Sequence, residues 1–175
     1  MLNLLEATNT AIELERKGHD LYISAAEKTT NKLGKETLRA IAAKEIDHIK
    51  AIEKFIEIFE AKSSDFNKAI ERVRPMEKKD YLRTIVSKLG KELETKVSPD
   101  ANLEKAYQTA MVFEKDSYEL YKKLAGEVSE LQAKKFFEFL MGEENMHYEL
   151  LQDTLEYLNK PGEWFKQQEK WIVEG

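Results

Sequence analysis

Apolar residues recur at alternating intervals of three and four positions in four long stretches of the chain. This spacing puts them on one side of a helix and is typical of the buried seam of an antiparallel helix bundle. The pattern predicts helices over residues 2–30, 35–61, 99–125 and 129–160. The positions expected to face inward are Leu5, Thr8, Ile12, Glu15, His19, Tyr22 and Ala26 in the first helix and Leu38, Ile41, Glu45, His48, Ile52, Phe55 and Phe59 in the second. In the third and fourth helices they are Leu103, Tyr107, Ala110, Glu114, Tyr121 and Leu124, then Phe137, Leu140, Glu144, His147, Leu151, Thr154 and Leu158.

Short connections pair these helices two by two. Residues 31–34 join the first two helices and residues 126–128 join the last two, and links this short predict antiparallel hairpins. Ser129 is the expected N-terminal cap of the fourth helix, and Pro161-Gly162 is a strong stop signal after it.

The segment between the two hairpins, residues 62–98, is too long for a plain loop in a compact domain. Apolar residues follow one another at every fourth position from Tyr81 to Leu93, which predicts a shorter crossover helix after Pro75. Ser98-Pro99 then provides a cap and a first-turn proline for the third long helix. Two hairpins joined by one long crossover form an all-α four-helix bundle of the ferritin-like type.

Composition supports one soluble helical domain over residues 1–175, because 42% of the residues are hydrophobic, 35% are charged, and only seven are glycine and three proline. The closing stretch, residues 161–175, carries Trp164 and Trp171 and is expected to pack on the bundle or on a partner subunit. The absence of cysteine excludes disulfides and thiolate metal sites.

Charge and hydropathy argue against two classes of binding partner, nucleic acids and membranes. The net charge of −5 and the lack of a basic block argue against a nucleic-acid partner. No apolar run approaches the roughly 18 residues that a membrane-spanning helix requires, so no membrane partner is expected. The N-terminus is amphipathic and acidic, unlike a signal peptide, which favours a cytoplasmic location.

One polar pattern occurs twice along these helices, with a constant offset of 99 residues. A glutamate is followed seven residues later by a tyrosine, and an E-x-x-H sequence follows on the next helix. The first copy consists of Glu15, Tyr22, Glu45 and His48, and the second of Glu114, Tyr121, Glu144 and His147. Four carboxylates and two imidazoles are the ligand count of a carboxylate-bridged di-metal site in a four-helix bundle.

These polar residues stand where the helical pattern requires apolar ones. Glu45 and His48, for example, lie between Ile41 and Ile52 on the expected inward face. Burying an unpaired carboxylate costs several kcal/mol, and four of them would repel one another. A pair of divalent cations removes this conflict, and residues three apart on a helix reach the same ion. Oxygen and nitrogen ligands without thiolate suit iron or manganese, with zinc as a competitor, and two iron ions are favoured because they can exchange two electrons with dioxygen or peroxide.

Structural alternatives exist for several of these residues. A single E-x-x-H sequence is usually a solvated surface pair, and the case for ligation comes from the doubling. Tyr22 and Tyr121 are either core aromatics or donors to ligand carboxylates, and both alternatives stay open. His19 is expected to be a core or interface histidine rather than a ligand. Near the ligands but on other sides of their helices, three acidic residues are expected to be solvated: Glu13, Asp47 and Glu143.

The doubled motif resembles the rubrerythrin family of the ferritin-like superfamily. The matching segments are ELERKGHDLY with AAKEIDHIKAIE, FEKDSYELY with MGEENMHYELL, and the tail GEWFKQQEKWIVEG. The resemblance implies a di-iron centre, with Tyr22 and Tyr121 beside it in supporting catalytic roles. It also implies reduction of hydrogen peroxide to water with electrons from an outside donor. The implied ligands are Glu15, Glu45, His48, Glu114, Glu144 and His147.

Two departures from the family pattern bear on function. Many rubrerythrins carry a rubredoxin module with four cysteines, which this chain lacks, so the electron donor is expected to be a separate protein. Many also have an extra glutamate three residues after the third-helix ligand, where this chain has Ser117, and Gly18 stands at the matching position of the first copy. That glutamate supports the iron movement of the peroxidase cycle, so a more symmetric six-ligand centre is expected here.

Three functions are therefore in competition. The leading hypothesis is a homodimeric oxidoreductase acting on hydrogen peroxide or dioxygen in oxidative-stress defence. The second is a ferroxidase that feeds iron storage, which needs a closed shell of subunits. The third is a non-enzymatic helical protein with a vestigial metal site.

Overall fold

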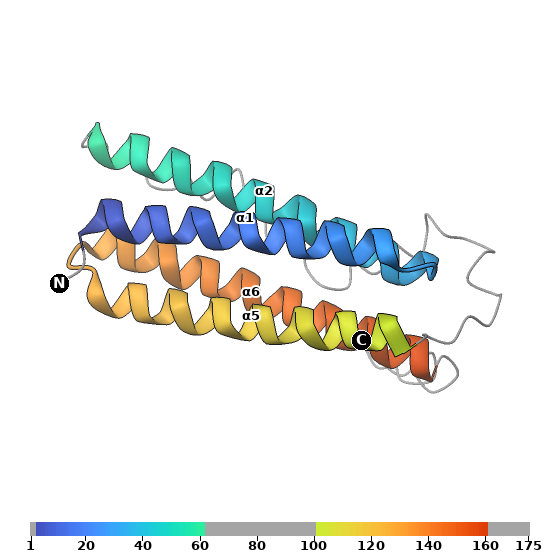
Figure 1. Cartoon of the computed structure of the whole chain (residues 1–175). Helices are drawn as coiled ribbons and strands as arrows, with labels where there is room; N and C mark the ends of the chain where they lie inside the picture. Colours follow the sequence, from blue (N-terminus) through green and yellow to red (C-terminus); the bar gives the residue numbers. More distant parts are fainter. Residues whose placement is uncertain (1–2, 62–100, 161–175) are drawn as a thin grey trace, which may run out of the picture.

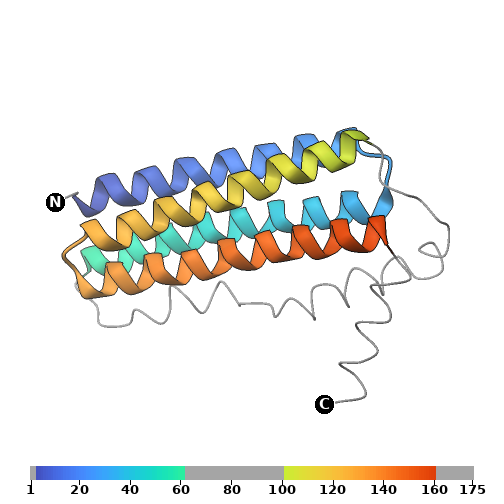
Figure 2. The same ribbon diagram turned by 90° about the horizontal axis from the view of Figure 1, so that it is seen from below.

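The computed structural model describes residues 3–61 and 101–160, which form long helices lying side by side (Figure 1). These helices are α1 (Leu4–Lys28), α2 (Lys32–Glu60), α5 (Ala101–Glu127) and α6 (Leu131–Asn159). α1 packs along α2 and α5 packs along α6, while contacts of α1 with α5 and of α2 with α6 join the two hairpins (Figure 2). Over the described residues, the predicted all-α four-helix bundle of two hairpins is confirmed.

The helices repeat with the same offset as the polar pattern. α2 begins at Lys32 and ends at Glu60, and α6 begins at Leu131 and ends at Asn159, so both ends differ by 99 residues. The ends of α1 and α5, Lys28 and Glu127, differ by 99 residues as well. Each hairpin is therefore one copy of a structural repeat.

The connection between α1 and α2 is shorter than predicted, because Lys32 to Gly34 belong to α2 rather than to a link. The side chain of Asn31 caps the helix by accepting a hydrogen bond from the Gly34 amide at 2.8 Å. Gly34 also allows a close approach of α5, since a Cβ there would lie 2.9 Å from Leu103 Cδ1. The glycine marks a helix contact and not a turn.

The second connection is displaced from its predicted place toward the C-terminus, whereas the first is displaced toward the N-terminus. α5 continues through Gly126 to Glu127, and α6 begins at Leu131 with Glu130 as its N-terminal cap instead of Ser129. Val128 is buried in this turn and packs into the core. Burial of this apolar side chain anchors the connection between the two helices.

The apolar core lies on both sides of a polar middle. One cluster contains the closely stacked rings of Phe55 and Phe136, whose centroids are 4.5 Å apart. The other cluster contains Leu38, Ile41 and Tyr107. The predicted inward faces are confirmed in most positions, but Leu5 is 53% exposed because Ala7 and Thr8 fill the inward positions there. Three further predicted core residues are only partly buried: Ile12, His19 and Phe59.

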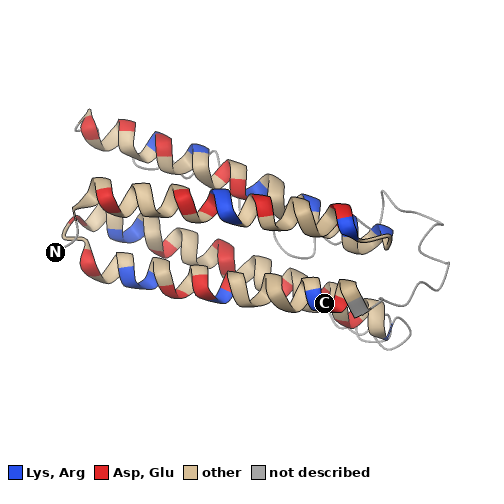
Figure 3. Ribbon diagram, viewed as in Figure 1, with Lys and Arg blue, Asp and Glu red and all other residues tan. Residues whose placement is uncertain are grey.

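Charged residues of both signs are distributed along the helices (Figure 3). Among the described helices, none is long and apolar enough to cross a membrane. The predicted crossover helix, Pro75, the Ser98-Pro99 cap and the tryptophan-bearing tail lie outside the described residues.

Candidate metal centre

Six polar residues meet in the middle of the bundle, and every helix contributes to them. α1 and α5 each supply one glutamate, and α2 and α6 each supply a glutamate and a histidine. All six residues are at most 1% exposed: Glu15, Glu45, His48, Glu114, Glu144 and His147. The structure thus brings together every residue that the doubled motif selected as a metal ligand.

The six residues form two overlapping groups of possible metal ligands. The first group is Glu15, Glu45, His48 and Glu144, and the second is Glu45, Glu114, Glu144 and His147. Within each group, one ligand atom per residue lies within 4.8 Å of all the others. Glu45 and Glu144 belong to both groups, which is the arrangement that two bridging carboxylates require.

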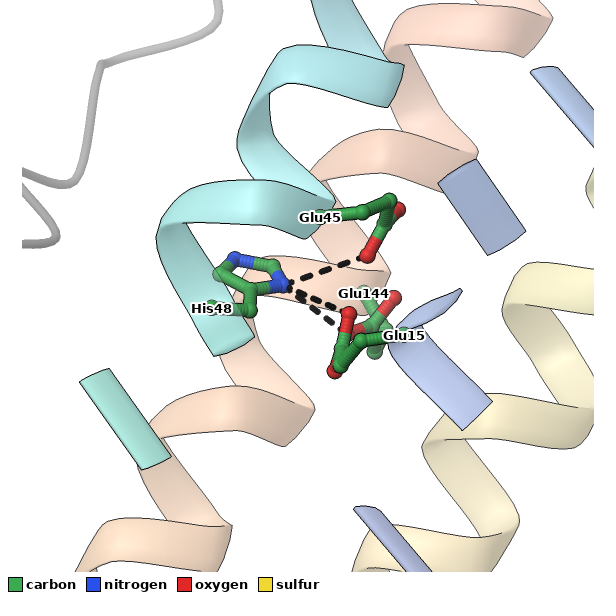
Figure 4. Close-up of side chains that lie close together, drawn as sticks. All are labelled: Glu15, Glu45, His48 and Glu144. Carbon is green, nitrogen blue, oxygen red and sulfur yellow. Dashed lines mark hydrogen bonds and ion pairs between the residues drawn. The ribbon is translucent and has the colours of Figure 1, made fainter. Parts of the chain in front are cut away.

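Each imidazole turns its Nδ1 atom toward the carboxylates. His48 Nδ1 lies 3.2 Å from Glu15 Oε2, 3.4 Å from Glu45 Oε2 and 3.6 Å from Glu144 Oε1. Figure 4 shows these three carboxylates converging on one ring nitrogen, while the other ring nitrogen points away from them.

The second histidine repeats this geometry. His147 Nδ1 lies 3.4 Å from Glu45 Oε1, 3.5 Å from Glu114 Oε1 and 3.7 Å from Glu144 Oε2. The two imidazole rings stack with centroids 5.3 Å apart. Both groups therefore present one nitrogen and three carboxylates, the first from α1, α2 and α6 and the second from α2, α5 and α6.

The tyrosine hydroxyls connect the two copies of the motif. Tyr22 of α1 donates to Glu114 of α5, and Tyr121 of α5 donates to Glu15 of α1. Both tyrosines are fully buried, and burial together with the adjacent carboxylates raises their pKa well above the usual value. The two alternatives for Tyr22 and Tyr121 are therefore both true: each is a core aromatic residue and each donates a hydrogen bond to a glutamate of the other hairpin.

Crowding shifts the pKa values of the carboxylates in opposite directions. Burial raises the pKa of Glu15 to about 8, and the negative charge of Glu45 adds to this effect. Burial and the neighbouring carboxylates raise the pKa of Glu144 well above its usual range. Burial also acts on Glu45, but hydrogen bonds from Glu15 and the two imidazoles outweigh it and lower the Glu45 pKa. The metal-free cluster thus retains protons on some of its carboxyl groups.

Burial and the neighbouring charges also act in opposite directions on the pKa values of the two imidazoles. Burial by itself lowers the pKa of a histidine, but the charge of Glu15 beside His48 and of Glu114 beside His147 raises both pKa values well above the usual one. In the metal-free protein, protons on these rings partly offset the buried negative charge. Metal ions would replace these protons.

Several buried atoms of the cluster have no hydrogen-bond partner in the described part of the chain. They are Glu45 Oε1, Glu114 Oε2, Glu144 Oε1 and both ring nitrogens of His147, together with His48 Nε2 and Glu143 Oε2. Buried polar atoms normally find a partner. Convergent oxygen and nitrogen atoms without partners fit a pair of divalent cations, and this donor set suits iron.

Glu143 was expected to be solvated, and this prediction is wrong. The residue is only 4% exposed, and its Oε2 atom lies 3.6 Å from His48 Nε2. The buried surface of α6 faces both α5 and α2, so it is wider than a single row of inward positions. A buried Lys44 at the matching position of the first copy shows the same effect.

The remaining neighbours lie outside the cluster. Glu13 is exposed, and Asp47 pairs with Lys50 at 3.2 Å on the surface, as their predicted solvation requires. His19 is partly exposed, and its Nδ1 atom lies 3.1 Å from Asp20 Oδ1. It belongs to neither group of possible ligands.

Phe113 is a neighbour of the centre that the sequence analysis missed. Its ring lies across the space beside Gly18, where an added Cβ would approach Phe113 Cε1 to 2.9 Å. The ring also meets Tyr22 edge-on, with centroids 6.1 Å apart. Ser117 is buried and donates to the Phe113 carbonyl at 2.9 Å. Sequence spacing gave no signal for Phe113, because this contact joins two helices.

Comparison with known protein families gives an independent result. A family model described as Rubrerythrin matches residues 6–155, which include all six clustered residues and both tyrosines. Searches of curated proteins and of solved structures gave no significant match. The family match and the buried carboxylate and histidine cluster together fit a di-iron protein.

Proposed function

This chain belongs to the rubrerythrin family, and we propose that its buried centre binds two iron ions and reduces hydrogen peroxide, or dioxygen, with electrons from a separate donor protein. The observation that carries the proposal is the pair of overlapping ligand groups, which share Glu45 and Glu144. A shared pair of carboxylates holds two ions at one site, and a two-electron reduction needs both.

The proposed reaction converts one hydrogen peroxide, two electrons and two protons into two water molecules. The bound iron pair would supply the two electrons that break the oxygen–oxygen bond. The donor protein must then return two electrons, since the chain has no cysteine that could act as an internal thiol reductant.

The residues around the centre orient the ligands and exclude water. Tyr22 and Tyr121 hold Glu114 and Glu15 by hydrogen bonds across the two hairpins. Phe113 covers the α1 side of the centre beside Gly18. A dry, pre-arranged set of ligands keeps the site in one geometry while charge and protons move.

A second candidate function is oxidation of ferrous iron for storage. It uses the same six residues and is favoured by the side chains at the position of the extra glutamate, since Gly18 has no carboxylate to offer and Ser117 donates to a backbone carbonyl. The two functions differ in their oxidant and in the assembly that they need.

Anaerobic loading with ferrous iron, followed by separate mixing with peroxide and with oxygen, tests both candidates. We expect about two iron ions per chain, with one for each ligand group, and faster oxidation by peroxide. Particle mass from light scattering is expected to indicate a dimer. A closed shell of many subunits with faster oxidation by oxygen would favour iron storage, and a protein that binds no iron would support a vestigial site.

A further inference from the structure

The two imidazoles of the centre differ on the side that faces away from the carboxylate ligands. Among the described residues neither Nε2 atom has a hydrogen-bond partner, but His48 Nε2 lies within ion-pair distance of a carboxylate, 3.6 Å from Glu143 Oε2, and His147 Nε2 has no such neighbour. The Nδ1 atoms of both rings face carboxylates of their own ligand group, although only His48 Nδ1 is within hydrogen-bond distance of one, Glu15 Oε2 at 3.2 Å. At the outer nitrogens the difference is one of charge, since among the described residues a carboxylate lies within ion-pair distance of His48 Nε2 alone.

Glu143 has the properties of a residue placed for His48. Its side chain is only 6% exposed, whereas a carboxylate on the outer side of α6, such as that of Glu138, is exposed to solvent. Its Oε2 atom has no hydrogen-bond partner, and the distance of 3.6 Å to His48 Nε2 is within the range of an ion pair. A contraction to about 2.9 Å would make an ordinary N–H···O hydrogen bond.

The chemistry of a metal-bound imidazole defines what such a carboxylate does. If Nδ1 is to bind an ion, its lone pair must be free and the ring proton must be on Nε2. A carboxylate that accepts the Nε2 proton selects this tautomer, fixes the ring and makes the ligand nitrogen more basic. Removing such a partner usually weakens metal binding by about 10- to 100-fold.

The internal repeat provides the comparison within the same molecule. The residue that corresponds to Glu143 in the first copy, 99 positions earlier, is Lys44, which is also buried. The residue directly before the glutamate of the E-x-x-H sequence is thus basic in the first copy, Lys44, and acidic in the second, Glu143. The charge near the two ligand groups differs accordingly, although the six proposed ligands themselves match.

We propose that Glu143 is a positioning residue that holds His48 through its Nε2 proton and makes the two metal positions unequal. The position formed by Glu15, Glu45, His48 and Glu144 takes the first ion, and the position of His147 takes the second. This inference rests on the proposed di-metal centre, which it deepens.

Zinc titration of the metal-free protein tests the inference without any turnover. In the wild type we expect two resolved steps with a competing chromophoric chelator. In Glu143→Gln, which keeps the shape and removes the charge, the first step should weaken by about 10-fold or more and the second by less than about 2-fold. Glu138→Gln, an exposed glutamate on the same helix, is the matched control and should leave both steps unchanged.

Nitrogen-15 spectra of the zinc-loaded protein separate positioning from a general loss of structure. The chain has only three histidines, so the ring signals of His19, His48 and His147 are few enough to assign by contacts with their neighbours. Glu143→Gln should move the Nε2 signal of His48 and leave that of His147 in place.

The outcomes are distinct. Two zinc ions bound with the same affinities and an unmoved His48 signal in Glu143→Gln would overturn the role of Glu143 and leave the metal centre intact. Two equal and independent zinc sites in the wild type would overturn it even if the variant failed to fold. A wild-type protein that binds no zinc or iron would overturn the centre itself.

Discussion

The α1–α2 hairpin and the α5–α6 hairpin are two copies of one sequence pattern that agree at the six proposed ligands and differ around them. Both supply a glutamate, a tyrosine and an E-x-x-H sequence at a constant offset of 99 residues. They differ where Lys44 corresponds to Glu143 and where Gly18 corresponds to Ser117. Agreement at these six residues is what a pair of metal ions held between both hairpins would require. The surrounding positions are free to make the two halves unequal.

The largest effect is expected from the carboxylates that serve both halves. Glu45→Ala combined with Glu144→Ala removes the two residues shared by both ligand groups, so binding of both ions should fall by more than about 100-fold. Glu15→Ala and Glu114→Ala each remove a ligand of one group and should each leave about one ion per chain. Iron counted after anaerobic loading checks this order. Retention of two ions by the double variant would refute the ligand assignment.

The pH dependence of the metal-free protein is expected to come next in size. The raised pKa values of Glu15 and Glu144 mean that the folded state binds these protons more tightly than the unfolded chain does. Their stabilisation is fully present below the ordinary carboxyl value of 4.5 and is lost as the pH rises, through about 8 for Glu15. The raised pKa values of the buried histidines act in the same direction above their ordinary value of 6.5.

Glu45 opposes this trend, because its lowered pKa contributes stability that is lost only as the pH falls. The net expectation is a lower unfolding free energy at pH 8 than at pH 5.5, with a slope of about 1.4 kcal/mol per pH unit for each proton released. Urea unfolding of the metal-free protein measures it. Glu15→Gln should flatten the dependence, and a stability that rises from pH 5.5 to pH 8 would contradict it.

The tyrosines test whether the two hairpins support each other equally. Tyr22→Phe and Tyr121→Phe each remove one buried hydroxyl that donates to a glutamate of the opposite hairpin. A hydrogen bond to a charged group contributes about 1.5–3 kcal/mol, so each variant should lose a similar amount of unfolding free energy. Urea unfolding at constant pH provides the comparison. A loss confined to one variant would show that only one of the two tyrosine–glutamate hydrogen bonds stabilises the contact between the hairpins.

Much of this architecture was predictable from sequence, since the helices and the six clustered residues follow from one-dimensional spacing. Side chains that are three or four positions apart share one face of a helix, so the inward glutamates stand out among apolar neighbours. Glu143 was assigned to solvent, because helical spacing describes a single row and the buried arc of α6 faces two neighbouring helices. Gly34 was likewise assigned to the connection between the first two helices, but it lies in α2, where the missing side chain leaves room for Leu103. Contacts between helices decide such positions, and the periodicity of one helix contains no information about them.

The smallest effect is expected at the position where the two copies carry Gly18 and Ser117. Gly18→Ala adds a Cβ that would approach Phe113 Cε1 to 2.9 Å, so the ring must move. The gain in helix propensity of up to about 1 kcal/mol offsets part of a packing cost of about 1–3 kcal/mol, which leaves a net loss of about 1 kcal/mol. Ser117→Ala removes only a hydroxyl that donates to the Phe113 carbonyl of its own helix, and should change stability by less than about 1 kcal/mol.

A double-mutant cycle identifies the cause of the Gly18 effect. Leu14 occupies the position in the first copy that corresponds to Phe113, so Phe113→Leu gives the second hairpin the residue of the first. The smaller side chain should accommodate the new methyl group, and Gly18→Ala should then cost less in the Phe113→Leu background than in the wild type. Thermal unfolding of the four proteins measures this coupling. Equal costs in both backgrounds would show that Gly18 is required for a reason other than the ring of Phe113, and the packing difference between the two hairpins would then have to lie elsewhere.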